Sequence, residues 1–326
     1  MTRVHVVGAA GYAASEFIRL ALRHPQLELG ALESASHAGQ PIAAHVAVLR
    51  RLDRAFDPPG TAGALVREGD AVVLGGGAET AREQAPVFLG KGARVIDLSD
   101  AFRLQQHAGE AVYGLPERYR DAIASARLVA NPGCYPTATL LALLPLAPFA
   151  NDIVQLIVDA KSGITGAGRN PATGSLFAEV DEDVRAYGLD RHRHQSEIEQ
   201  ELSGVGIVAP LVFTPQIVPL RRGLLAGCYA LLSREPSDRE IDTAFLTSYD
   251  SSPFVRILPK ERAPSLVAVA GTNDAELHVS RRGRVVRILA ALDNLGKGAA
   301  GEALQNLNLM YGYPEESALE DRAIVV

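Results

Sequence analysis

The sequence predicts an α/β protein with a helix-covered parallel sheet in its first half and a mixed or antiparallel sheet in its second. Three observations support this prediction. Short apolar strands alternate with helical segments as far as about residue 130. A glycine turn directly follows the first strand, as in nucleotide-binding folds. From about residue 153 the apolar segments lengthen, and few helices separate them.

The strands of the first half are short apolar runs, each ending in Gly, Asp or Ser. They are expected at residues 4–7, 27–32, 71–74, 95–98 and 128–129. Helical spacing of apolar side chains predicts a helix over residues 15–24. The longer strands of the second half are expected at residues 153–158, 205–213, 224–232, 265–269 and 285–292. An apolar stripe predicts the last helix at residues 297–310.

The composition suits two domains with sizeable cores, since the chain has 326 residues of which 47% are hydrophobic. Its net charge of −6 argues against nucleic-acid and acidic-membrane partners, which need a basic face. The two distant cysteines form neither a disulfide framework nor a metal motif. We expect the first residues to enter a strand and not to form a leader peptide, and we expect the apolar run 138–150 to be too short to span a bilayer. We therefore expect a cytoplasmic protein.

A nucleotide-binding turn is expected where the first strand meets the first helix. Gly8 would make the tight turn, and Gly11 would let backbone N–H groups approach a pyrophosphate. Ala14 would allow the helix to pack closely on the strand. An ordinary turn between a strand and a helix is the alternative.

The end of the second strand bears on the choice between NAD and NADP. Glu33 lies about 20 residues past the glycines, where an acid usually accepts from the ribose 2′-OH of NAD and repels the 2′-phosphate of NADP. Ser34, Ser36 and His37 are nevertheless suited to holding a phosphate. The residues by themselves therefore leave the choice of cofactor open.

Cys134 is the candidate nucleophile. It comes just before the apolar stretch 138–146, which places a thiol at the first turn of a helix. The partial positive charge and free N–H groups of a helix start favour the reactive thiolate. Gly133 lets the backbone turn tightly, and Pro132 fixes its approach. The alternative is a small buried hydrophobe, which is what most free cysteines are.

Two histidines downstream are candidates for the base that a thiol nucleophile needs. His192 and His194 precede an acidic amphipathic helix, and in an extended segment they would point to opposite sides. One of them can take the proton of Cys134 and later protonate a leaving oxygen. A solvated charged face is the alternative. The pair has no third ligand cluster, so we expect no metal site.

Cations and hydroxyls after several strand ends predict a pocket for an anionic substrate. The glycine-rich segment 161–169 carries Ser162 and suits an anion. Arg103, which follows Ser99 at another strand end, is able to bind phosphate bidentately, and Arg222 is a further candidate. Taken singly, each arginine is more often part of a surface ion pair. Together they favour an anion pocket.

These residues lie in segments that match a known family. In family order, the segments are GAAGYAASE (8–16), DLSDAFRL (97–104), YGLPERYR (113–120), ANPGCYPTA (130–138), KSGITGAGR (161–169), HRHQSEIEQEL (192–202), FTPQIVPLRRGLLA (213–226), GTND (271–274) and LDNLGKGAAGEALQNLNLMYG (292–312). Asn-Pro-Gly-Cys-Tyr-Pro-Thr and His-Arg-His-x-x-Glu-Ile are highly specific together. Through these segments the chain resembles the N-acetyl-γ-glutamyl-phosphate reductases of arginine biosynthesis, in their longer form.

The resemblance implies an NADP(H)-dependent reduction through a cysteine thioester, with NAD(H) not excluded. Cys134 would attack the acyl phosphate of N-acetyl-γ-glutamyl phosphate, and phosphate would leave. Hydride from NADPH would reduce the thioester to a thiohemiacetal that releases N-acetylglutamate semialdehyde. His194 is the preferred acid–base and His192 the second choice. N–H groups at the helix start near Cys134 would hold the oxyanion.

The resemblance also implies an architecture and a set of site residues. A Rossmann-type domain is expected from residues 1–150 plus 295–326, and an inserted α+β domain for catalysis and subunit contact from residues 151–294. We therefore expect a homo-oligomer, either a dimer or a tetramer, with a small-molecule substrate. Cofactor binding is expected at Gly8, Gly11, Tyr12, Ala14, Ser34, Ser36 and Gly76. Substrate or phosphate binding is expected at Ser99, Arg103, Asn131, Ser162, Gly163 and Arg222.

Two segments depart from the family pattern near the expected cofactor. The family usually has a Ser-Arg pair after the second strand, which grips the NADP phosphate, whereas this chain has Ser34-Ala35 preceded by Glu33. A segment that usually ends in Leu-Pro-His-Gly reads Gly75-Gly76-Gly77-Ala78 here. These departures leave the strength of the preference for NADP over NAD open, and they bear on the mode of cofactor binding.

Three other functions compete with this one. A sister enzyme of lysine biosynthesis acts on an acyl phosphate one carbon longer, but its members often depart from Pro-Gly-Cys-Tyr-Pro-Thr, which is intact here. Aspartate-semialdehyde dehydrogenase shares the chemistry but not the His-Arg-His segment. A non-catalytic nucleotide sensor would use Cys134 as a redox switch, and the paired histidines count against it.

Overall fold

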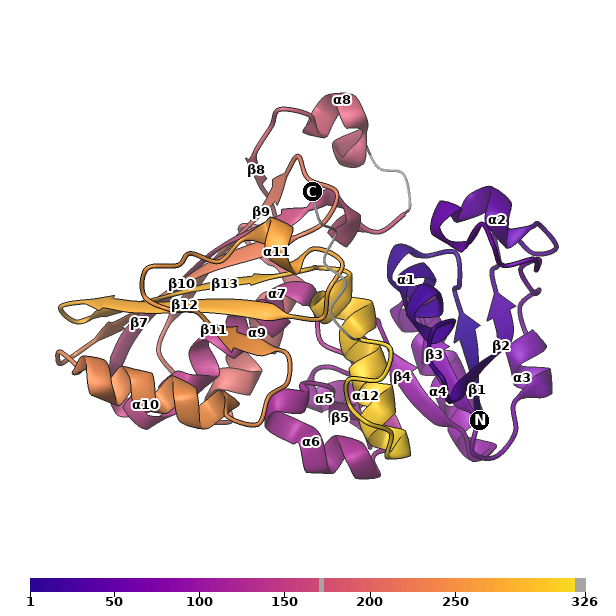
Figure 1. The fold of residues 1–326 in the computed structure, drawn as a ribbon, viewed down its shortest axis with the longest axis horizontal. Coiled ribbons are helices and arrows are strands. Elements are labelled where there is room, and N and C mark those ends of the chain that lie inside the picture. Colours follow the sequence, from indigo (N-terminus) through magenta and orange to yellow (C-terminus); the bar gives the residue numbers. More distant parts are fainter. Residues whose placement is uncertain (170–172, 320–326) are drawn as a thin grey trace. The chain divides into compact units, whose positions relative to one another are not determined.

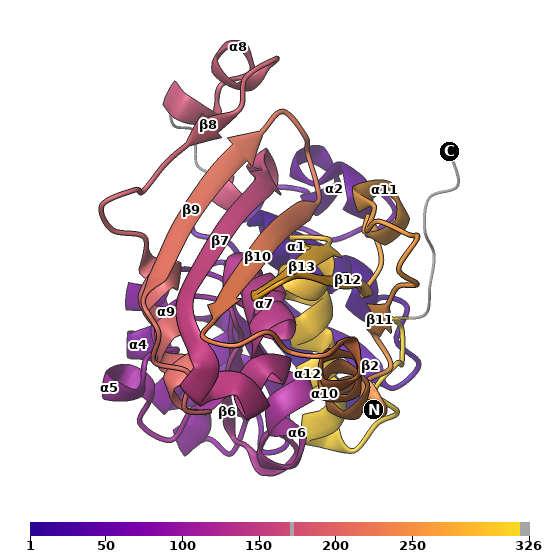
Figure 2. The same cartoon turned by 90° about the vertical axis from the view of Figure 1, so that its left-hand side faces the viewer.

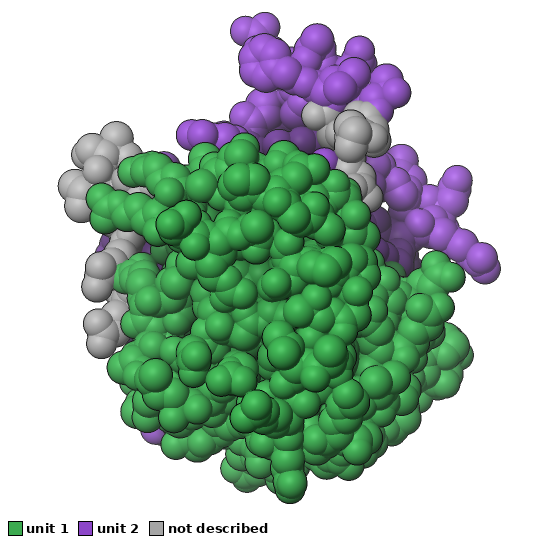
Figure 3. All heavy atoms as spheres, turned by 90° about the vertical axis from the view of Figure 1, so that its right-hand side faces the viewer, with its two compact units in different colours: residues 1–133, 299–320 green, residues 134–298, 321–326 purple. Residues whose placement is uncertain are grey.

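The computed structural model describes residues 1–169 and 173–319 of the chain, which Figure 1 traces from end to end. The chain forms two compact units, coloured separately in Figure 3. The first contains residues 1–133 and the described residues from 299 onward, and the second contains the described residues between 134 and 298. The units thus divide at Cys134, whereas the domains expected from the sequence divide at residue 150. The domain assignment stays a prediction, and its last residues, 320–326, lie outside the described chain.

The first unit contains a six-stranded parallel sheet with strand order β2-β1-β3-β4-β6-β5. Its strands are β1 (Thr2–Val7), β2 (Leu27–Glu33), β3 (Ala71–Leu74), β4 (Arg94–Asp97), β5 (Val112–Tyr113) and β6 (Leu128–Ala130). Strands such as β3 are buried along their whole length, which is why they appear in the sequence as unbroken apolar runs. The strand order reverses between β1 and β3, and ligands bind outside the carboxyl ends of strands at such a point. This open α/β sheet is of Rossmann type.

Helices and short turns connect these strands. They are α1 (Tyr12–Ala21), α2 (Ile42–His45), η1 (Ala47–Leu49), α3 (Thr61–Leu65), α4 (Ala78–Gly90), α5 (Gln105–Ala108), α6 (Pro116–Ser125) and α12 (Gly301–Tyr311). Helix α12 packs against α1 and α6, so the C-terminal helix belongs to the first unit. Helix α1 begins three residues before the start expected from the sequence, because Gly11 occupies its N-cap.

The second unit contains a seven-stranded mixed sheet with strand order β11-β12-β13-β10-β7-β9-β8. Its strands are β7 (Ile153–Gly163), β8 (Arg185–Ala186), β9 (Leu211–Val218), β10 (Leu224–Leu232), β11 (Val255–Ile257), β12 (Ala275–Arg282) and β13 (Val285–Leu292). The pairs β7–β9 and β11–β12 are parallel, and the other neighbours are antiparallel. A mixed sheet is what the sequence predicts for this half, and the predicted fold class is confirmed.

The helical segments of the second unit are α7 (Cys134–Leu143), η2 (Leu144–Asp152), η3 (Ile164–Ala167), η4 (Thr173–Ser175), α8 (Phe177–Val180), α9 (Arg193–Ser203), α10 (Asp238–Tyr249) and α11 (Leu266–Val269). A π-helical turn, Gly296–Ala300, leads into α12. The strand expected at residues 265–269 is wrong. The N–H of Val269 bonds back to the carbonyl of Ser265, which makes this segment α11. A short apolar run fits either structure, and only backbone pairing decides between them.

The mixed sheet buries one face and leaves the other open. Alternate residues of β10 are fully buried: Leu224, Ala226, Cys228, Ala230 and Leu232. Helix α7 packs on β10 and β13, and α9 packs on α7. In Figure 2 these helices lie behind the sheet, and no helix of the described chain crosses its front over β7, β9 and β10. That open face carries Ile157 of β7, paired with Val212 of β9 and Tyr229 of β10.

Within the described ranges, no helix combines the length and the apolar character needed to cross a membrane.

Replacing Gly8 by alanine should destabilise the protein more than the same change at Gly39. Both glycines have left-handed backbone, with φ of 75° and 76°, which costs a side-chain-bearing residue about 1 kcal/mol or more. A Cβ at Gly8 would lie 2.6 Å from the carbonyl carbon of Gly75, whereas a Cβ at Gly39 meets nothing within 4 Å. We expect Gly8→Ala to lose about 1–3 kcal/mol more than Gly39→Ala in urea unfolding. Equal losses would show that the contact with Gly75 is not tight.

Candidate active site

Two glycine turns meet at the reversal of strand order in the first unit. Gly8 follows β1, and its backbone lies so close to Gly75 after β3 that no Cβ fits between them. A Cβ added at Gly75 would lie 3.1 Å from the Cβ of Ala14, so a small residue at position 14 lets α1 approach. Gly11 has no side chain with which to cap α1. The first N–H groups of α1, beginning at Tyr12, can therefore bind an anion such as a pyrophosphate.

The turn after β3 also suits a dinucleotide. Gly77 has a φ of 96° and is the N-cap of α4. A Cβ at Gly76 would press on the side chain of Thr80 at 3.0 Å. The start of α4, like the start of α1, therefore has a glycine at its N-cap and no side chain there to cover the backbone N–H groups. The glycine residues expected to bind a cofactor are brought together here.

Glu33, at the end of β2, does not present its carboxylate to solvent. Its side chain is buried, with only 3% of the residue exposed, and one carboxylate oxygen accepts the N–H of Ala62. Ala62 lies in the first turn of α3, whose partial positive charge offsets the carboxylate. The Ser34 and Ser36 hydroxyl oxygens lie 3.4 Å apart just beyond it. Glu33 is thus committed to α3, which weakens the repulsion of a phosphate expected from the sequence.

Cys134 is the first residue of α7, as its position in the sequence predicts. It is partly exposed, whereas every other residue of that helix is buried. A Cβ added at Gly298 in the π-helical turn would lie 2.8 Å from the Cβ of Cys134, so only glycine fits against it. The Tyr135 hydroxyl donates to the carbonyl of Gln216 on β9 at 2.9 Å and ties the helix start to the sheet. The thiol is therefore held at the positive end of a fixed helix.

Asn131 and Arg103 have bonds within the first unit, just before the turn to Cys134. The Arg103 Nε–H donates to the carbonyl of Asn131 at 2.8 Å, and an Nη2–H donates to the carbonyl of Leu98 at 3.0 Å. The Asn131 amide donates to the carbonyl of Ala299 and accepts from the side chain of Asn306, each at 3.1 Å. These contacts fix the loop, and the substrate contacts expected of the two residues stay predictions.

The two histidines lie together at the start of α9. His192 is its N-cap, and its Nδ1 accepts the backbone N–H of His194 at 3.2 Å. The ring centroids of the two histidines are 4.8 Å apart, and each lies 5.9 Å from the ring of Tyr135, next to Cys134. The expectation that they point to opposite sides is wrong, because residues two apart lie on the same side even of an extended segment, and here the helix begins at Arg193, between the two. Both rings thus approach the residue that follows the thiol.

The two histidines differ in their burial and bonding. Burial, with a smaller effect from the neighbouring Arg193 charge, lowers the pKa of His192 to about 4. His192 is therefore neutral at pH 7, and because Nδ1 accepts a bond, its proton is on Nε2. His194 lies in the first turn of α9 and is only 5% exposed. Tyr187 packs against His192 with ring centroids 5.3 Å apart and encloses it further.

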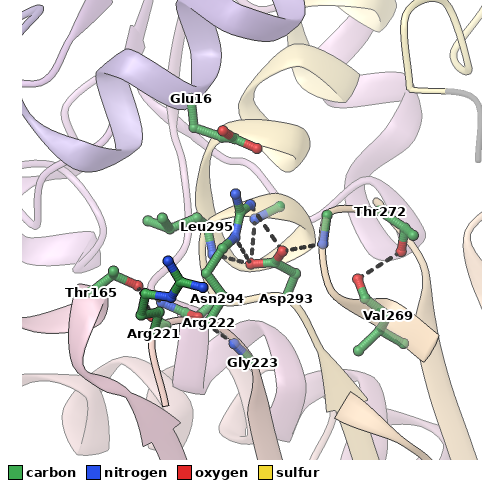
Figure 4. A network of polar contacts seen from close by, with 12 residues as sticks. Glu16, Thr165, Arg221, Arg222, Gly223, Val269, Thr272, Asp293, Asn294 and Leu295 are labelled. Carbon is green, nitrogen blue, oxygen red and sulfur yellow. Dashed lines mark hydrogen bonds and ion pairs between the residues drawn. The ribbon is translucent and has the colours of Figure 1, made fainter. Parts of the chain in front are cut away.

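Arg222 is held by a buried carboxylate, as Figure 4 shows. Asp293 is fully buried and accepts from the Arg222 Nε at 3.1 Å, while its other oxygen lies 2.9 Å from Nη2. The same carboxylate accepts the backbone N–H groups of Gly271, Leu295 and Gly296. The pair therefore anchors the start of the turn that reaches Gly298 and the thiol.

Strand ends β7, β10 and β13 meet around this pair. The Asn294 side chain bonds the N–H of Gly223 at 2.8 Å and the Thr165 hydroxyl at 2.9 Å. Gly163 lies against the backbone of Leu220 and Arg221, where a Cβ would not fit. Ser162 at the end of β7 is buried, and its hydroxyl donates to the carbonyl of Gly163 at 3.2 Å.

Ser99 lies elsewhere, at the end of β4 in the first unit. Its hydroxyl contacts both oxygens of Asp97 at 2.7 and 2.8 Å. Burial raises the pKa of Asp97, while the Ser99 bonds act in the opposite direction. Ser99 is thus engaged with its own strand end, and its substrate contact stays a prediction.

Sequence reasoning missed Asp293, Asn294 and Tyr187. Asp293-Asn294 directly follows an apolar strand, a position that was used as a signal in the first half of the chain but not in the second. The described chain holds no group of three or more His, Cys, Asp or Glu side chains suited to a metal ion.

Comparison with known proteins identifies the family. Residues 3–126 match the family described as semialdehyde dehydrogenase, NAD binding domain, and residues 134–294 match semialdehyde dehydrogenase, dimerisation domain. An N-acetyl-gamma-glutamyl-phosphate reductase from Acidithiobacillus ferrooxidans is 40% identical over 100% of both chains, and one from Moorella thermoacetica is 41% identical over 98% of each. The chain belongs to this reductase family. It is an oxidoreductase of amino-acid biosynthesis with an NAD(P)-binding domain.

Solved structures support the fold of the family member. A probable aspartate-semialdehyde dehydrogenase from Pseudomonas aeruginosa has a TM-score of 0.73 at 22% identity and covers 95% of this chain and 98% of that one. Aspartate semialdehyde dehydrogenase from Candida albicans, solved with NADP, has a TM-score of 0.71 at 14% identity, over 95% of this chain and 98% of that one. At these identities the likeness concerns the fold alone.

Replacing His192 by asparagine should flatten the dependence of stability on pH. His192 has a pKa of about 4 in the folded protein and about 6.5 when unfolded, so its contribution is present above pH 6.5 and is lost as the pH falls towards 4. Asparagine keeps an N-cap acceptor but does not titrate. We expect urea unfolding between pH 7 and 4.5 to show a smaller loss of stability in His192→Asn than in the wild type. Identical losses would contradict the low pKa.

Proposed function

We propose that this family member catalyses the NADPH-dependent reduction of N-acetyl-γ-glutamyl phosphate to N-acetylglutamate 5-semialdehyde and phosphate. The observation that carries the proposal is the partly exposed thiol of Cys134 at the start of an otherwise buried helix, with two histidines beside the next residue. The 40% identity over full length to reductases named for this substrate supports it. The bare glycine turns at Gly8 and Gly76 fit a dinucleotide.

The proposed reaction passes through a thioester on Cys134. The thiolate attacks the acyl carbon, the C–O bond to phosphate breaks, and phosphate leaves with the bonding electron pair. N–H groups at the start of α7 stabilise the oxyanion of each tetrahedral species. NADPH, when bound, supplies a hydride to the thioester carbonyl. The resulting thiohemiacetal loses its hydroxyl proton as the C–S bond breaks, which yields the aldehyde and restores the thiolate.

His194 is proposed as the acid–base for these proton transfers. The Nδ1 of His192 is already occupied by the N–H of His194, and its Nε2 carries a proton, so the neutral ring has no open lone pair in this arrangement. Its pKa of about 4 also makes it a weak base. His192 therefore positions the start of α9, and His194 exchanges protons with the thiol and the thiohemiacetal oxygen.

Replacing Cys134 by serine should abolish phosphate-dependent reduction of NADP⁺ by N-acetylglutamate semialdehyde, because a serine hydroxyl is a far poorer nucleophile at neutral pH. Cys228→Ala is the control, since burial raises the pKa of that thiol and keeps it protonated in β10. We expect the control to keep activity and both variants to fold, as judged by circular dichroism. Activity in Cys134→Ser would contradict the thioester mechanism.

Replacing His194 by alanine should lower kcat by about 10²–10⁴-fold, the usual range for an acid–base residue. The matched variant is His192→Asn, which retains a cap for α9 and should lose far less. Steady-state kinetics in the direction of semialdehyde oxidation measure both. A larger loss in His192→Asn than in His194→Ala would reverse the two roles.

The open face of the mixed sheet is proposed to pair with a second copy of this chain. The second unit matches a family described as a dimerisation domain, and the open face is apolar around Ile157, Val212 and Tyr229. Such contiguous apolar area usually marks an interface. Ile157 is 44% exposed in the single chain.

Replacing Ile157 by arginine should weaken self-association, because a charge would be buried in the contact. Val48→Arg is the control, since Val48 is 60% exposed but lies in the first unit. We expect the dimer dissociation constant in analytical ultracentrifugation to rise at least about tenfold for Ile157→Arg alone. A wild-type monomer at micromolar concentration, or equal effects of both variants, would rule out this interface.

A further inference from the structure

We propose that His37, stacked on His45, binds the 2′-phosphate of NADP(H) together with the hydroxyls of Ser34 and Ser36. The proposal rests on the proposed function, because it assigns the group that selects the cofactor of that reaction. In dinucleotide-binding folds the residues just after the second strand meet the adenosine ribose, and a cation there accommodates the phosphate of NADP. In this chain the position next to Ser34 is Ala35, so a cation must come from elsewhere.

The two imidazoles are held as a pair. Their ring centroids are 4.1 Å apart with an interplanar angle of 27°. Both rings contact Phe56, with centroid distances of 6.0 Å for His37 and 6.3 Å for His45, and Phe56 is 1% exposed. A backbone bridge between Ala38 and Phe56 fixes the segment that carries His37. Two half-buried histidines on a rigid support provide N–H donors that do not have to be ordered when an anion binds.

The hydroxyls supply further donors in the same turn. The Ser34 and Ser36 oxygens lie 3.4 Å apart, a separation that lets both address one phosphate. Ser34 follows directly on the end of β2, where the ribose is expected, and Ser36 is adjacent to His37. Hydroxyl groups and imidazole N–H groups can both donate hydrogen bonds to a phosphate oxygen.

The charges around this turn are arranged in favour of an anion. Glu33 is the acid that would repel a 2′-phosphate, but its carboxylate accepts the N–H of Ala62 at the start of α3. Asp57 accepts the N–H of Leu32 and lies 3.4 Å from the guanidinium of Arg54. Both nearby carboxylates are thus neutralised in part by partners of the protein itself. In residues 34–39, directly after β2, the polar side chains are the hydroxyls of Ser34 and Ser36 and the imidazole of His37.

The test compares ligands that differ by the 2′-phosphate alone. Dissociation constants of NADP⁺, NAD⁺, 2′-phospho-AMP and AMP are measured by calorimetry on the full chain. For His37→Ala we expect about tenfold weaker binding of NADP⁺ and 2′-phospho-AMP, with NAD⁺ and AMP within about twofold of wild type. His107→Ala, an exposed histidine of α5, is the control and should change none of them. Adding Ala35→Arg to His37→Ala should restore the binding of NADP⁺.

Each contrary result has a separate meaning. Equal weakening of NADP⁺ and NAD⁺ in His37→Ala would overturn the proposal, because it would place the ring against the adenine. Unchanged binding of NADP⁺ in that variant would overturn it as well, while the reductase reaction would stand. A wild-type enzyme that is active with NADH but not with NADPH would overturn both the phosphate site and the proposed cofactor, and would leave the chemistry of Cys134 intact.

Discussion

The nucleotide turn and the thiol site of this protein both depend on backbone N–H groups at the start of a helix. A helix leaves its first N–H groups unbonded, and they can serve a ligand only if no side chain caps them. Helix α1 begins after Gly11, which has no side chain to use as a cap. Helix α7 begins at Cys134 itself. A side chain at these points would cover the N–H groups or clash with the neighbouring segment. This explains why glycines lie where these helix starts approach other segments.

At the thiol site, further contacts hold the start of the helix rigidly in place. Helix α7 is buried along the rest of its length. Tyr135 fastens the first turn to β9, and the buried Asp293 fastens the turn that carries Gly298. A carboxylate that accepts this many hydrogen bonds is held in one position. The thiol that we propose as the nucleophile is therefore positioned by groups to which we assign no chemical step.

The sequence predicted those parts of the structure that are determined by neighbouring residues. The turn from β1 to α1 and the position of Cys134 follow from short motifs, because the glycines and the apolar run next to them fix the backbone. The bond between Glu33 and Ala62 and the ion pair of Arg222 with Asp293 join residues 29 and 71 positions apart. No periodicity reports such pairings. The strand wrongly expected at residues 265–269 failed for the same reason, since a short apolar run contains no information about its backbone partners.

The two histidines of the His-Arg-His segment occupy different positions at the start of α9 and therefore have different roles. Because α9 begins at Arg193, the first histidine falls on the N-cap and the second falls in the first turn. A cap must present a lone pair to the helix, and an imidazole does so only while that nitrogen carries no proton. The same bond that makes His192 a cap thus removes it as a base and holds its ring 4.8 Å from His194. The spacing of two residues therefore supplies a fixed neutral ring and, beside it, the second imidazole to which we assign proton transfer.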